Sequence, residues 1–520
     1  MSNSKELIAV VKKICDQLRS KMEVTEYRDY IMGFLFFKYL SEQSEKNFEE
    51  FKERVDYIKY SEFDENHEQF KKIKEIIIQN DDDFFLAYKY SFQNVVDMMN
   101  QGKNVIPTIE ESFNKIESIN SELNDEKKEF FKDLFTNIDF SNKNLGNIDE
   151  EKEKTIQLII KEINTLNLSM DEVDHFGNTY EYLLSEFASD TGKKAGEFYT
   201  PSKVAELLVK IVSHGKNKIN KAYDPACGSG SLLIKLANKV GKYNKIYGQE
   251  VKTATYNLAR MNFILRGVPF SKLDLRSGDT LINPLHIEEE DSFDCIVANP
   301  PFSQKWNPTQ ELSKDRRYNP YPSLAPKSYA DFAFLQHMLF HVNKDNGIIA
   351  SVFSLGILSR KSPKAEEDIR KYIIDKNYID TIIFLPPNLF YNTGIESCII
   401  VARKNKPTND KRIFMINATK EFQNAKKQNT LSDENINRIF SAWKEKREEE
   451  NFSKYISYED IVKNEYSLSM RFYDLDNFDE ESEDIDIDFV ESEIVKINEE
   501  LLKYENEFKK NLNEFLNKKN

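Results

Sequence analysis

The chain has 520 residues, of which 40% are hydrophobic and 31% are charged, and its formal net charge is −15. A chain of this length is expected to form two or three domains with sizeable cores. No apolar run approaches the roughly 18 residues of a membrane span, and the N-terminal stretch lacks the apolar core of a secretory signal. The four scattered cysteines form no CxxC pair, which argues against a disulfide framework or zinc ribbon and indicates a reducing, cytoplasmic location.

The charge is distributed unevenly. Between Phe176 and Lys420, Lys and Arg outnumber Asp and Glu, whereas both flanks are strongly acidic. This asymmetry is compatible with a DNA-facing core whose flanks contact a basic partner protein. For the flanks alone, solvated charge without a partner explains the composition equally well.

Residues 1–170 are predicted to be helical, because glycine and proline are nearly absent and apolar residues recur three and four positions apart. The segment Arg28–Leu40 is apolar on most faces, which places it at the centre of the predicted bundle. No catalytic constellation is visible here. The sequence leaves open whether this region clamps a substrate, contacts a partner or only supplies packing.

A glycine-containing loop leads into a helix predicted for Ser202–Val212. Pro201 is expected in the first turn of this helix, with Thr200 as its cap. The aromatic pair Phe198 and Tyr199 precedes the helix N-terminus, a position that suits a ligand carboxylate or hydroxyl. An ordinary capped helix is the simpler explanation.

A strand, a glycine turn and a helix are predicted for residues 221–236. Asp224 ends the strand, and Gly228 and Gly230 allow the backbone to approach a nucleoside closely. Leu233 stands where a dinucleotide fingerprint has its third glycine, and no lysine of a Walker loop is present. Neither NAD nor a nucleoside triphosphate is therefore the favoured ligand.

Three further side chains end successive predicted strands. Glu250 follows Gly230 at the distance of about 20 residues at which a carboxylate can accept both ribose hydroxyls. Asp279, after the third strand, can hydrogen-bond the exocyclic amine of an adenine ring. With Asp224 and Asn299, they appear in the order in which a doubly wound sheet would line one crevice.

The fourth of these strands, Cys295–Ala298, is predicted to be buried and to stop at an Asn-Pro-Pro-Phe corner. Proline cannot continue a central ladder, so Asn299 is held at the carboxyl end of the strand. The side-chain carbonyl of Asn299 and the backbone carbonyl of Pro300 can accept both protons of an exocyclic amine, and Phe302 offers a face for stacking. These features favour methylation of an amino group on an aromatic base. A strand ending in a rigid turn is equally compatible with the tetrapeptide alone.

Residues 303–328 form a predicted loop in which basic and aromatic residues alternate. Contact with phosphates and a displaced base is as compatible with this pattern as simple mobility. His337 and His341 lie four apart without a third ligand, which favours helix packing over metal binding. Four later strands are predicted at Ile348–Phe353, Asp380–Leu385, Cys398–Ala402 and Ile413–Asn417. Together with the earlier strands, they bring the predicted sheet to about seven strands.

From Leu431 onward the sequence is polar and is predicted to be helical. Residues 471–488 are rich in acids and read as a linker. The last predicted helix, Phe489–Leu516, carries apolar residues at three-four spacing, which indicates a seam for a partner helix. Packing back on its own chain is the alternative.

These segments resemble the adenine-N6 DNA methyltransferases, and most fully the modification subunit of Type I restriction–modification systems. The resemblance covers most of the chain and rests on GEFYTP at 196–201, DPACGSG at 224–230, GDTL at 278–281 and NPPF at 299–302. It implies an α/β fold with a Rossmann-like methyltransferase sheet, preceded by a helical domain and followed by a C-terminal helix for partner contact. The implied domains are an N-terminal helical domain, a catalytic domain, and a helical and acidic C-terminal region, at 1–170, 171–425 and 426–520.

The resemblance implies a site-specific, adenine-specific DNA methyltransferase that transfers a methyl group from S-adenosylmethionine to N6 of adenine in double-stranded DNA. A flipped adenine would be held by the catalytic residues Asn299, Pro300, Pro301 and Phe302. The implied cofactor-binding residues are Glu197, Phe198, Tyr199, Thr200, Pro201, Ser202, Asp224, Ala226, Gly228, Ser229, Gly230, Ser231, Glu250 and Asp279. No metal is expected.

The implied partners are double-stranded DNA, a specificity subunit and a restriction subunit, with two modification chains per specificity subunit and no membrane. One departure from the family pattern is Ser354–Gly356, where a more glycine-rich turn is expected. The alternatives are a protein-glutamine or ribosomal-RNA amino methyltransferase, and an inactive methyltransferase fold that serves as a scaffold or DNA-binding subunit. GEFYTP, together with the helical front and the C-terminal seam, argues against the first. The intact Asn299, Glu250 and glycines argue against the second.

Overall fold

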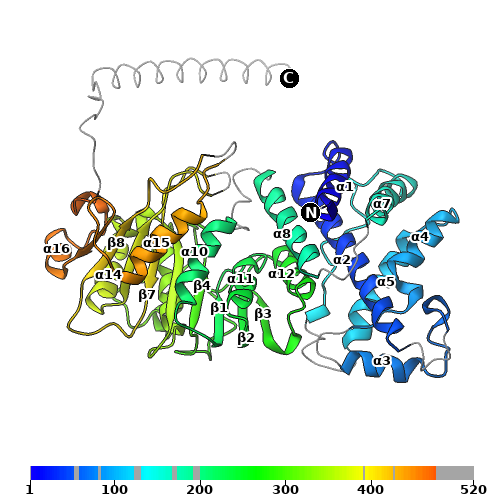
Figure 1. Cartoon of the computed structure of the whole chain (residues 1–520), viewed down its shortest axis with the longest axis horizontal. Coiled ribbons are helices and arrows are strands. Elements are labelled where there is room, and N and C mark those ends of the chain that lie inside the picture. Colours follow the sequence, from blue (N-terminus) through cyan, green and yellow to red (C-terminus); the bar gives the residue numbers. More distant parts are fainter. Residues whose placement is uncertain are drawn as a thin grey trace, which may run out of the picture.

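The computed structural model describes residues 2–51, 58–79, 84–121, 130–166, 173–190, 200–390, 393–424 and 428–475. A bundle of helices lies at one end of the molecule, and a unit built on one sheet lies at the other (Figure 1). In these ranges, no helix has the length and apolar character needed to cross a membrane.

The helical end confirms the prediction for Arg28–Leu40. This segment lies within α2, which is buried without interruption from Tyr30 to Ser41 because it is apolar on most sides. The helix α8 packs against α1 and α2 and also against α12 of the sheet unit, so it joins the two ends of the molecule. The helices of this part are α1 (Ser2–Leu18), α2 (Val24–Glu49), α3 (Phe70–Gln79), α4 (Phe92–Asn100), α5 (Ile106–Ser121), α7 (Asp149–Asn164) and α8 (Val173–Asp190).

The sheet has nine strands rather than the predicted seven or so, in the order β3-β2-β1-β4-β5-β7-β6-β8-β9. The α/β class is as predicted. The strands are β1 (Ile219–Asp224), β2 (Tyr243–Glu250), β3 (Leu273–Ser277), β4 (Cys295–Ala298), β5 (Ile348–Ser354), β6 (Ile379–Phe384), β7 (Ser397–Ala402), β8 (Ile413–Asn417) and β9 (Ser453–Ile456).

The strands β3, β2, β1, β4 and β5 are mutually parallel, whereas β7 is antiparallel to both β5 and β6. From β1 the chain first builds outward through β2 to β3, and then returns to place β4 on the other side of β1. The sheet therefore has a topological switch point between β1 and β4. In open α/β sheets the crevice at such a point, beyond the carboxyl ends of the strands, is where ligands bind.

Both faces of the sheet are covered, so successive residues of a strand enter different cores. Cys295 and Val297 belong to one apolar cluster, and Ile296 and Ala298 belong to the other. This alternation follows from the period of two in a strand, and burial on both faces explains why β4 is apolar throughout. The covering helices are α10 (Ser202–Val212), α11 (Ser231–Val240), α12 (Thr253–Leu265) and α15 (Asp433–Glu445) on one face, and α13 (Asp331–His341), α14 (Lys364–Asp375) and α16 (Tyr458–Lys463) on the other.

The region after residue 425 is not only helical, which corrects the prediction. The short strand β9 pairs antiparallel with β8 at the edge of the sheet, and α15 packs against α10 and β8. A four-residue edge strand with polar residues carries too weak an alternation to be recognised in the sequence. The predicted helix at 489–516 lies outside the described residues.

Short 3₁₀ turns occur at Tyr60–Glu62, Tyr88–Tyr90, Phe270–Lys272, Gln310–Lys314, Leu355–Leu358 and Met470–Phe472.

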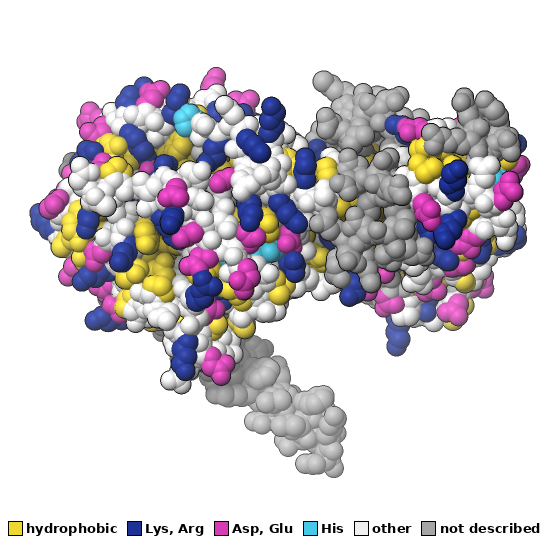
Figure 2. Space-filling model, turned by 90° about the horizontal axis from the view of Figure 1, so that it is seen from below, with side chains coloured by type: hydrophobic (Ala, Val, Ile, Leu, Met, Phe, Trp, Pro, Cys, Tyr) yellow, Lys and Arg dark blue, Asp and Glu magenta, His cyan; other side chains and the backbone are white. Residues whose placement is uncertain are grey.

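The charged surface is mixed. On the face drawn in Figure 2, Lys and Arg side chains are interspersed with Asp and Glu over the sheet unit rather than gathered in one patch.

Candidate active site

Two buried carboxylates end the neighbouring strands β1 and β2. Asp224 is 1% exposed, and its Oδ1 accepts a hydrogen bond from the Ala226 N–H at 2.9 Å. Glu250 accepts from the Gly228 N–H at 3.1 Å and from the Lys252 N–H at 2.8 Å. Glu250 therefore fixes the turn that follows β1, and the first two strand ends form one unit.

Burial governs the protonation of both acids. Burial, with a smaller contribution from the nearby charge of Glu250, raises the pKa of Asp224 to about 8 against the lowering effect of the Ala226 N–H. Burial also raises the pKa of Glu250, against the lowering effect of its hydrogen bonds from backbone N–H groups. Two carboxylates in such a setting favour a ligand that brings hydroxyl donors or positive charge.

The turn between β1 and α11 needs its glycines. Gly228 and Gly230 have φ values of +54° and +77°, a region that other residues rarely occupy. A Cβ on Gly230 would lie 2.7 Å from a ring carbon of Phe263. The turn is also held by the Asn262 amide, which donates to the Ser229 carbonyl at 3.0 Å, and the hydroxyls of Ser229 and Ser231 lie 3.1 Å apart. Because α11 begins at Ser231, its free N–H groups lie at the carboxyl edge of the sheet.

The loop after β3 brings Asp279 to the same edge. Asp279 is half-buried and accepts from the Leu281 N–H at 2.9 Å, which shapes the loop. The hydroxyl of Thr280 donates to the Pro225 carbonyl at 2.5 Å and so ties this loop to the turn after β1. The predicted cofactor-binding acids are thus brought together by hydrogen bonds between three loops.

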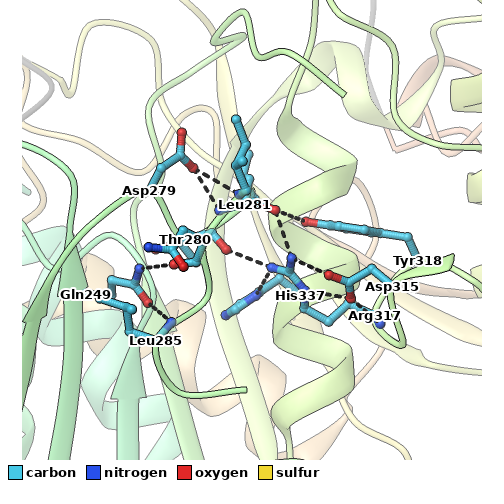
Figure 3. A network of polar contacts seen from close by, with 11 residues as sticks. Gln249, Asp279, Thr280, Leu281, Leu285, Asp315, Arg317, Tyr318 and His337 are labelled. Atoms are coloured by element: carbon cyan, nitrogen blue, oxygen red, sulfur yellow. Dashed lines mark hydrogen bonds and ion pairs between the residues drawn. The ribbon is translucent and has the colours of Figure 1, made fainter. Parts of the chain in front are cut away.

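Gln249 holds the Asp279 loop from beneath, and the sequence analysis missed it. Its side-chain amide donates to the carbonyls of Gly278 at 3.1 Å and Asn283 at 2.9 Å, and its carbonyl accepts from the Leu285 N–H at 3.0 Å (Figure 3). Gln249 is fully buried. A polar residue beside the acid, at the end of the strand, was the available signal.

The corner after β4 presents an acceptor that has no donor. Asn299 follows the fully buried Ala298, and its Oδ1 is buried without a hydrogen-bond partner among the described residues. Such an atom costs on the order of 1–3 kcal/mol unless a ligand pairs with it. Pro300 is buried, Pro301 is partly exposed, and the Phe302 ring meets the Phe390 ring edge-on at 5.2 Å between centroids.

Asp331, the first residue of α13, fixes the chain just beyond this corner. Its Oδ1 lies 3.4 Å from both the Ser303 N–H and the Ser354 hydroxyl, and its other oxygen accepts from Arg360 at 3.1 Å. Ser303 has a φ of +51°, so the chain turns sharply after Phe302. The predicted departure at Ser354–Gly356 thus supplies a hydroxyl that supports Asp331.

The segment before α10 is only partly described. Glu197, Phe198 and Tyr199 lie outside the described residues. Pro201 occupies the N-cap position without a side-chain hydrogen bond, and Ser202 begins the helix. The expectation that Thr200 caps the helix and Pro201 lies in its first turn is therefore wrong by one residue. Thr200 and Pro201 are buried and Ser202 is exposed.

The loop at 303–328 is folded, and its basic and aromatic residues divide into two groups. Trp306, Arg317 and Tyr318 are buried, whereas Lys305 and Lys327 are exposed. The pattern that suggested a DNA-contacting surface therefore includes side chains that are buried inside the protein.

His337 and His341 pack inside the protein, as predicted. His337 hydrogen-bonds the Tyr223 hydroxyl at 3.0 Å, and burial lowers the pKa of His341 to about 3. Among the described residues, no group of three or more His, Cys, Asp or Glu could hold a metal ion.

Comparisons with known proteins identify the relatives of this chain. A family model described as "N-6 DNA Methylase" matches residues 171–483, and one described as "HsdM N-terminal domain" matches residues 7–163. The chain is 33% identical over 504 residues to the methylase subunit of the Type I restriction enzyme MpnII from Mycoplasma pneumoniae, covering 93% of this chain and 92% of that protein. It is 34% identical over 366 residues to the methylase subunit of the Type I restriction enzyme MjaVIII from Methanocaldococcus jannaschii. That match covers 67% of this chain and 61% of that protein. A crystal structure of the type I restriction-modification methyltransferase subunit from Streptococcus thermophilus superposes with a TM-score of 0.81 at 33% identity, covering 90% of this chain and 99% of that one.

Proposed function

Because the chain belongs to the N-6 DNA methylase family and to the methylase subunits of Type I restriction enzymes, we propose that it transfers a methyl group from S-adenosylmethionine to N6 of adenine in double-stranded DNA. It does so as the methylating subunit of a Type I restriction–modification complex. The observation that carries the mechanism is the buried Oδ1 of Asn299 at the switch point of the sheet, which has no hydrogen-bond partner in the part of the chain that the structure describes. That atom is an acceptor placed where a donor must arrive with the substrate.

The Asn299 corner holds the target amine. The N6 lone pair of adenine is delocalised into the ring, so this nitrogen is a poor nucleophile. Hydrogen bonds from the amine to Asn299 Oδ1 and to the Pro300 carbonyl favour a more tetrahedral nitrogen whose lone pair faces the methyl donor. Phe302 stacks on the extruded base, and Pro301 keeps the corner rigid. No covalent intermediate with the protein is needed.

The acid-ended strands hold the cofactor. S-adenosylmethionine supplies an electrophilic methyl group on a positively charged sulfur. Glu250 accepts the ribose hydroxyls, Asp279 accepts from the adenine amine, and Asp224 shapes the glycine turn by accepting from the Ala226 N–H. The fit rests on the buried carboxylates and on the glycine turn, in which Gly228 and Gly230 adopt positive φ values. The remaining proposed contacts are Glu197, Phe198, Tyr199, Thr200, Pro201, Ser202, Ala226, Gly228, Ser229 and Ser231.

Orientation is the main source of rate in this mechanism. Holding two reactants in a near-attack geometry can lower a barrier by roughly 7–11 kcal/mol. Extruding the adenine from the duplex costs on the order of a few kcal/mol. Contacts with DNA phosphates offset that cost, so DNA binding should weaken as the salt concentration rises.

The proposed partners follow from the name of the relatives, which are subunits of restriction enzymes. They are double-stranded DNA, a specificity subunit that selects the sequence, and a restriction subunit, with two copies of this chain per specificity subunit. The segment 489–516 is the proposed contact with the specificity subunit. The proposed regions of the chain are 1–170, 171–425 and 426–520, and β9, from the third region, pairs within the sheet.

The test is transfer of a tritiated methyl group from S-adenosylmethionine to DNA, by the full chain with and without the proposed specificity subunit. We expect incorporation at adenine N6 with the partner and poor incorporation without it. Absence of transfer by the complex would overturn the proposed reaction. Efficient methylation of one defined site by the chain alone would overturn the proposed subunit role.

A further inference from the structure

Arg317 belongs to the loop that follows the Asn299 corner, yet its guanidinium lies beneath the loop that carries Asp279 (Figure 3). Its side chain is fully buried. Nη1 donates to the Thr280 carbonyl at 2.7 Å, and Nη2 donates to the Leu281 carbonyl at 2.9 Å. One side chain therefore satisfies two successive backbone carbonyls next to a proposed cofactor ligand.

Arg317 is itself held by groups that fit only a guanidinium. Asp315 accepts from Nε at 3.0 Å and from Nη2 at 2.8 Å, which is the two-point pairing of an arginine with a carboxylate. Nη1 also lies 3.0 Å from Nδ1 of His337, whose Nε2 is paired with the Tyr223 hydroxyl. Burial, together with the nearby positive charge of Arg317, keeps the pKa of His337 well below its usual value. His337 is therefore neutral and accepts from Arg317 at Nδ1.

The other end of the same loop is closed beside the base corner. The Ala330 N–H donates to the Gln304 carbonyl at 2.9 Å, and the Trp306 N–H donates to the Lys327 carbonyl at 3.1 Å. The loop thus begins and ends next to Ser303 and Asp331, and its tip reaches the Asp279 loop through Arg317. Together with the pairing of β1 and β4, it connects the two halves of the proposed site.

We propose that Arg317 is a positioning residue that fixes the Thr280–Leu281 backbone, and through it the orientation of Asp279 toward S-adenosylmethionine. This inference rests on the proposed function. Arg317 touches no substrate and acts through the loop above it. A lysine has a single ammonium and cannot serve two carbonyls, Asp315 and His337 together. Without the guanidinium, the two carbonyls lose their charged donors and the Asp279 loop can shift.

The experiment measures binding of S-adenosylmethionine to the full chain by calorimetry, independently of DNA and of turnover. We expect Arg317→Met to raise Kd by about tenfold or more, the effect of losing roughly one strong hydrogen bond. Arg317→Lys should lie between this variant and the wild type. Circular dichroism and thermal unfolding establish that each variant is folded.

The matched control is Arg370→Met. Arg370 is also 1% exposed, and it also binds backbone carbonyls, those of Tyr466, Ile357 and Arg360, but none of them belongs to the Asp279 loop. We expect its Kd to stay within about twofold of the wild type. If Arg317→Met does not fold, Asp315→Asn removes the charge partner of Arg317 at constant size and should raise Kd in the same direction.

The outcomes separate the two proposals. Wild-type affinity in a folded Arg317→Met, or in Asp315→Asn where the first variant does not fold, would overturn the positioning role and leave the proposed function standing. An equal loss in Arg317→Met and Arg370→Met would also overturn it, since general loosening would then explain both. A wild-type chain that does not bind S-adenosylmethionine would overturn the proposed function itself. As a second readout, raising S-adenosylmethionine should restore turnover of Arg317→Lys in the complex, because the defect lies in binding.

Discussion

Asp224 and Glu250 end neighbouring parallel strands, and their carboxylates are buried in each other's field. Burial first, and the charge of Glu250 after it, raise the pKa of Asp224 to about 8. Below that pH the folded protein therefore keeps Asp224 protonated, which avoids a second buried negative charge beside Glu250. A positively charged cofactor bound at this edge would favour the ionised form of Asp224.

This pair predicts how stability depends on pH in the absence of cofactor. The pKa of Asp224 in the folded protein lies above its ordinary value of 3.8. The folded state therefore holds its proton more tightly than the unfolded state, so the stabilisation is complete below about pH 4 and is lost as pH rises through about 8. As pH rises over that range, we expect the Tm of the wild type to fall relative to the Tm of Asp224→Asn, because the asparagine side chain does not ionise. Thermal unfolding at a series of pH values measures it, and parallel curves would contradict the assignment.

Asn299→Ala removes the unpaired acceptor of the base corner. We expect methyl transfer by the complex to fall by about 10²-fold or more, the scale of losing one preorganised polar group in an active site. Calorimetric Kd for S-adenosylmethionine should stay near the wild-type value, because Asn299 lies on the base side. Asn346→Ala is the control, since this exposed residue precedes β5 at the opposite edge of the sheet. Full activity in Asn299→Ala would remove the proposed mechanism.

Gly230 and Gly241 flank the same helix, α11, and both have left-handed backbones, with φ of +77° and +69°. Gly241→Ala meets no atom within 4 Å and should cost only the backbone strain, about 1–2 kcal/mol. Gly230→Ala adds the collision with Phe263 at 2.7 Å, so it should cost more in urea unfolding and should also weaken S-adenosylmethionine binding. Equal effects of the two substitutions on binding would show that the close contact between the glycine turn and Phe263 does not shape the cofactor site.

Asp331→Asn tests the support of the base corner. Asp331 joins Arg360 to the Ser303 N–H, so loss of its charge should loosen the turn after Phe302. We expect methyl transfer to fall by about tenfold, with unchanged binding of S-adenosylmethionine. Glu366→Gln is the control because Glu366 pairs with the same Arg360, at 2.5 Å, without contacting Ser303. If both variants lose activity equally, the effect belongs to Arg360 rather than to the corner.

Removal of residues 489–520 tests the proposed partner helix. The apolar three-four spacing of this segment predicts that its loss weakens assembly with the specificity subunit. Size-exclusion chromatography of the mixed subunits measures assembly. Binding of S-adenosylmethionine by the shortened chain is the control for folding. If assembly is undiminished, the proposed contact between this segment and the specificity subunit is wrong.

The sequence alone determined the local parts of this site. The corner at Asn299 follows from the chemistry of two prolines after an apolar strand, and the turn at Gly230 follows from the need for a left-handed backbone. Asp224, Glu250 and Asp279 could be assigned to strand ends because strand period and turn residues are local signals. These features depend on neighbours in the chain, so no knowledge of pairing was needed.

Only the tertiary structure decided which residues support these parts. The pairing of β9, the contacts of Gln249 and the burial of Arg317 all depend on which segments meet in space. Local periodicity in the sequence does not predict such contacts. Arg317 illustrates the point, since in the sequence it belongs to a basic and aromatic loop that could equally face DNA. In the fold its charge is neutralised by Asp315, and its donors are taken by the Thr280 and Leu281 carbonyls. A buried guanidinium is stable only where the fold supplies all its partners at once, and that condition is set by packing rather than by sequence pattern.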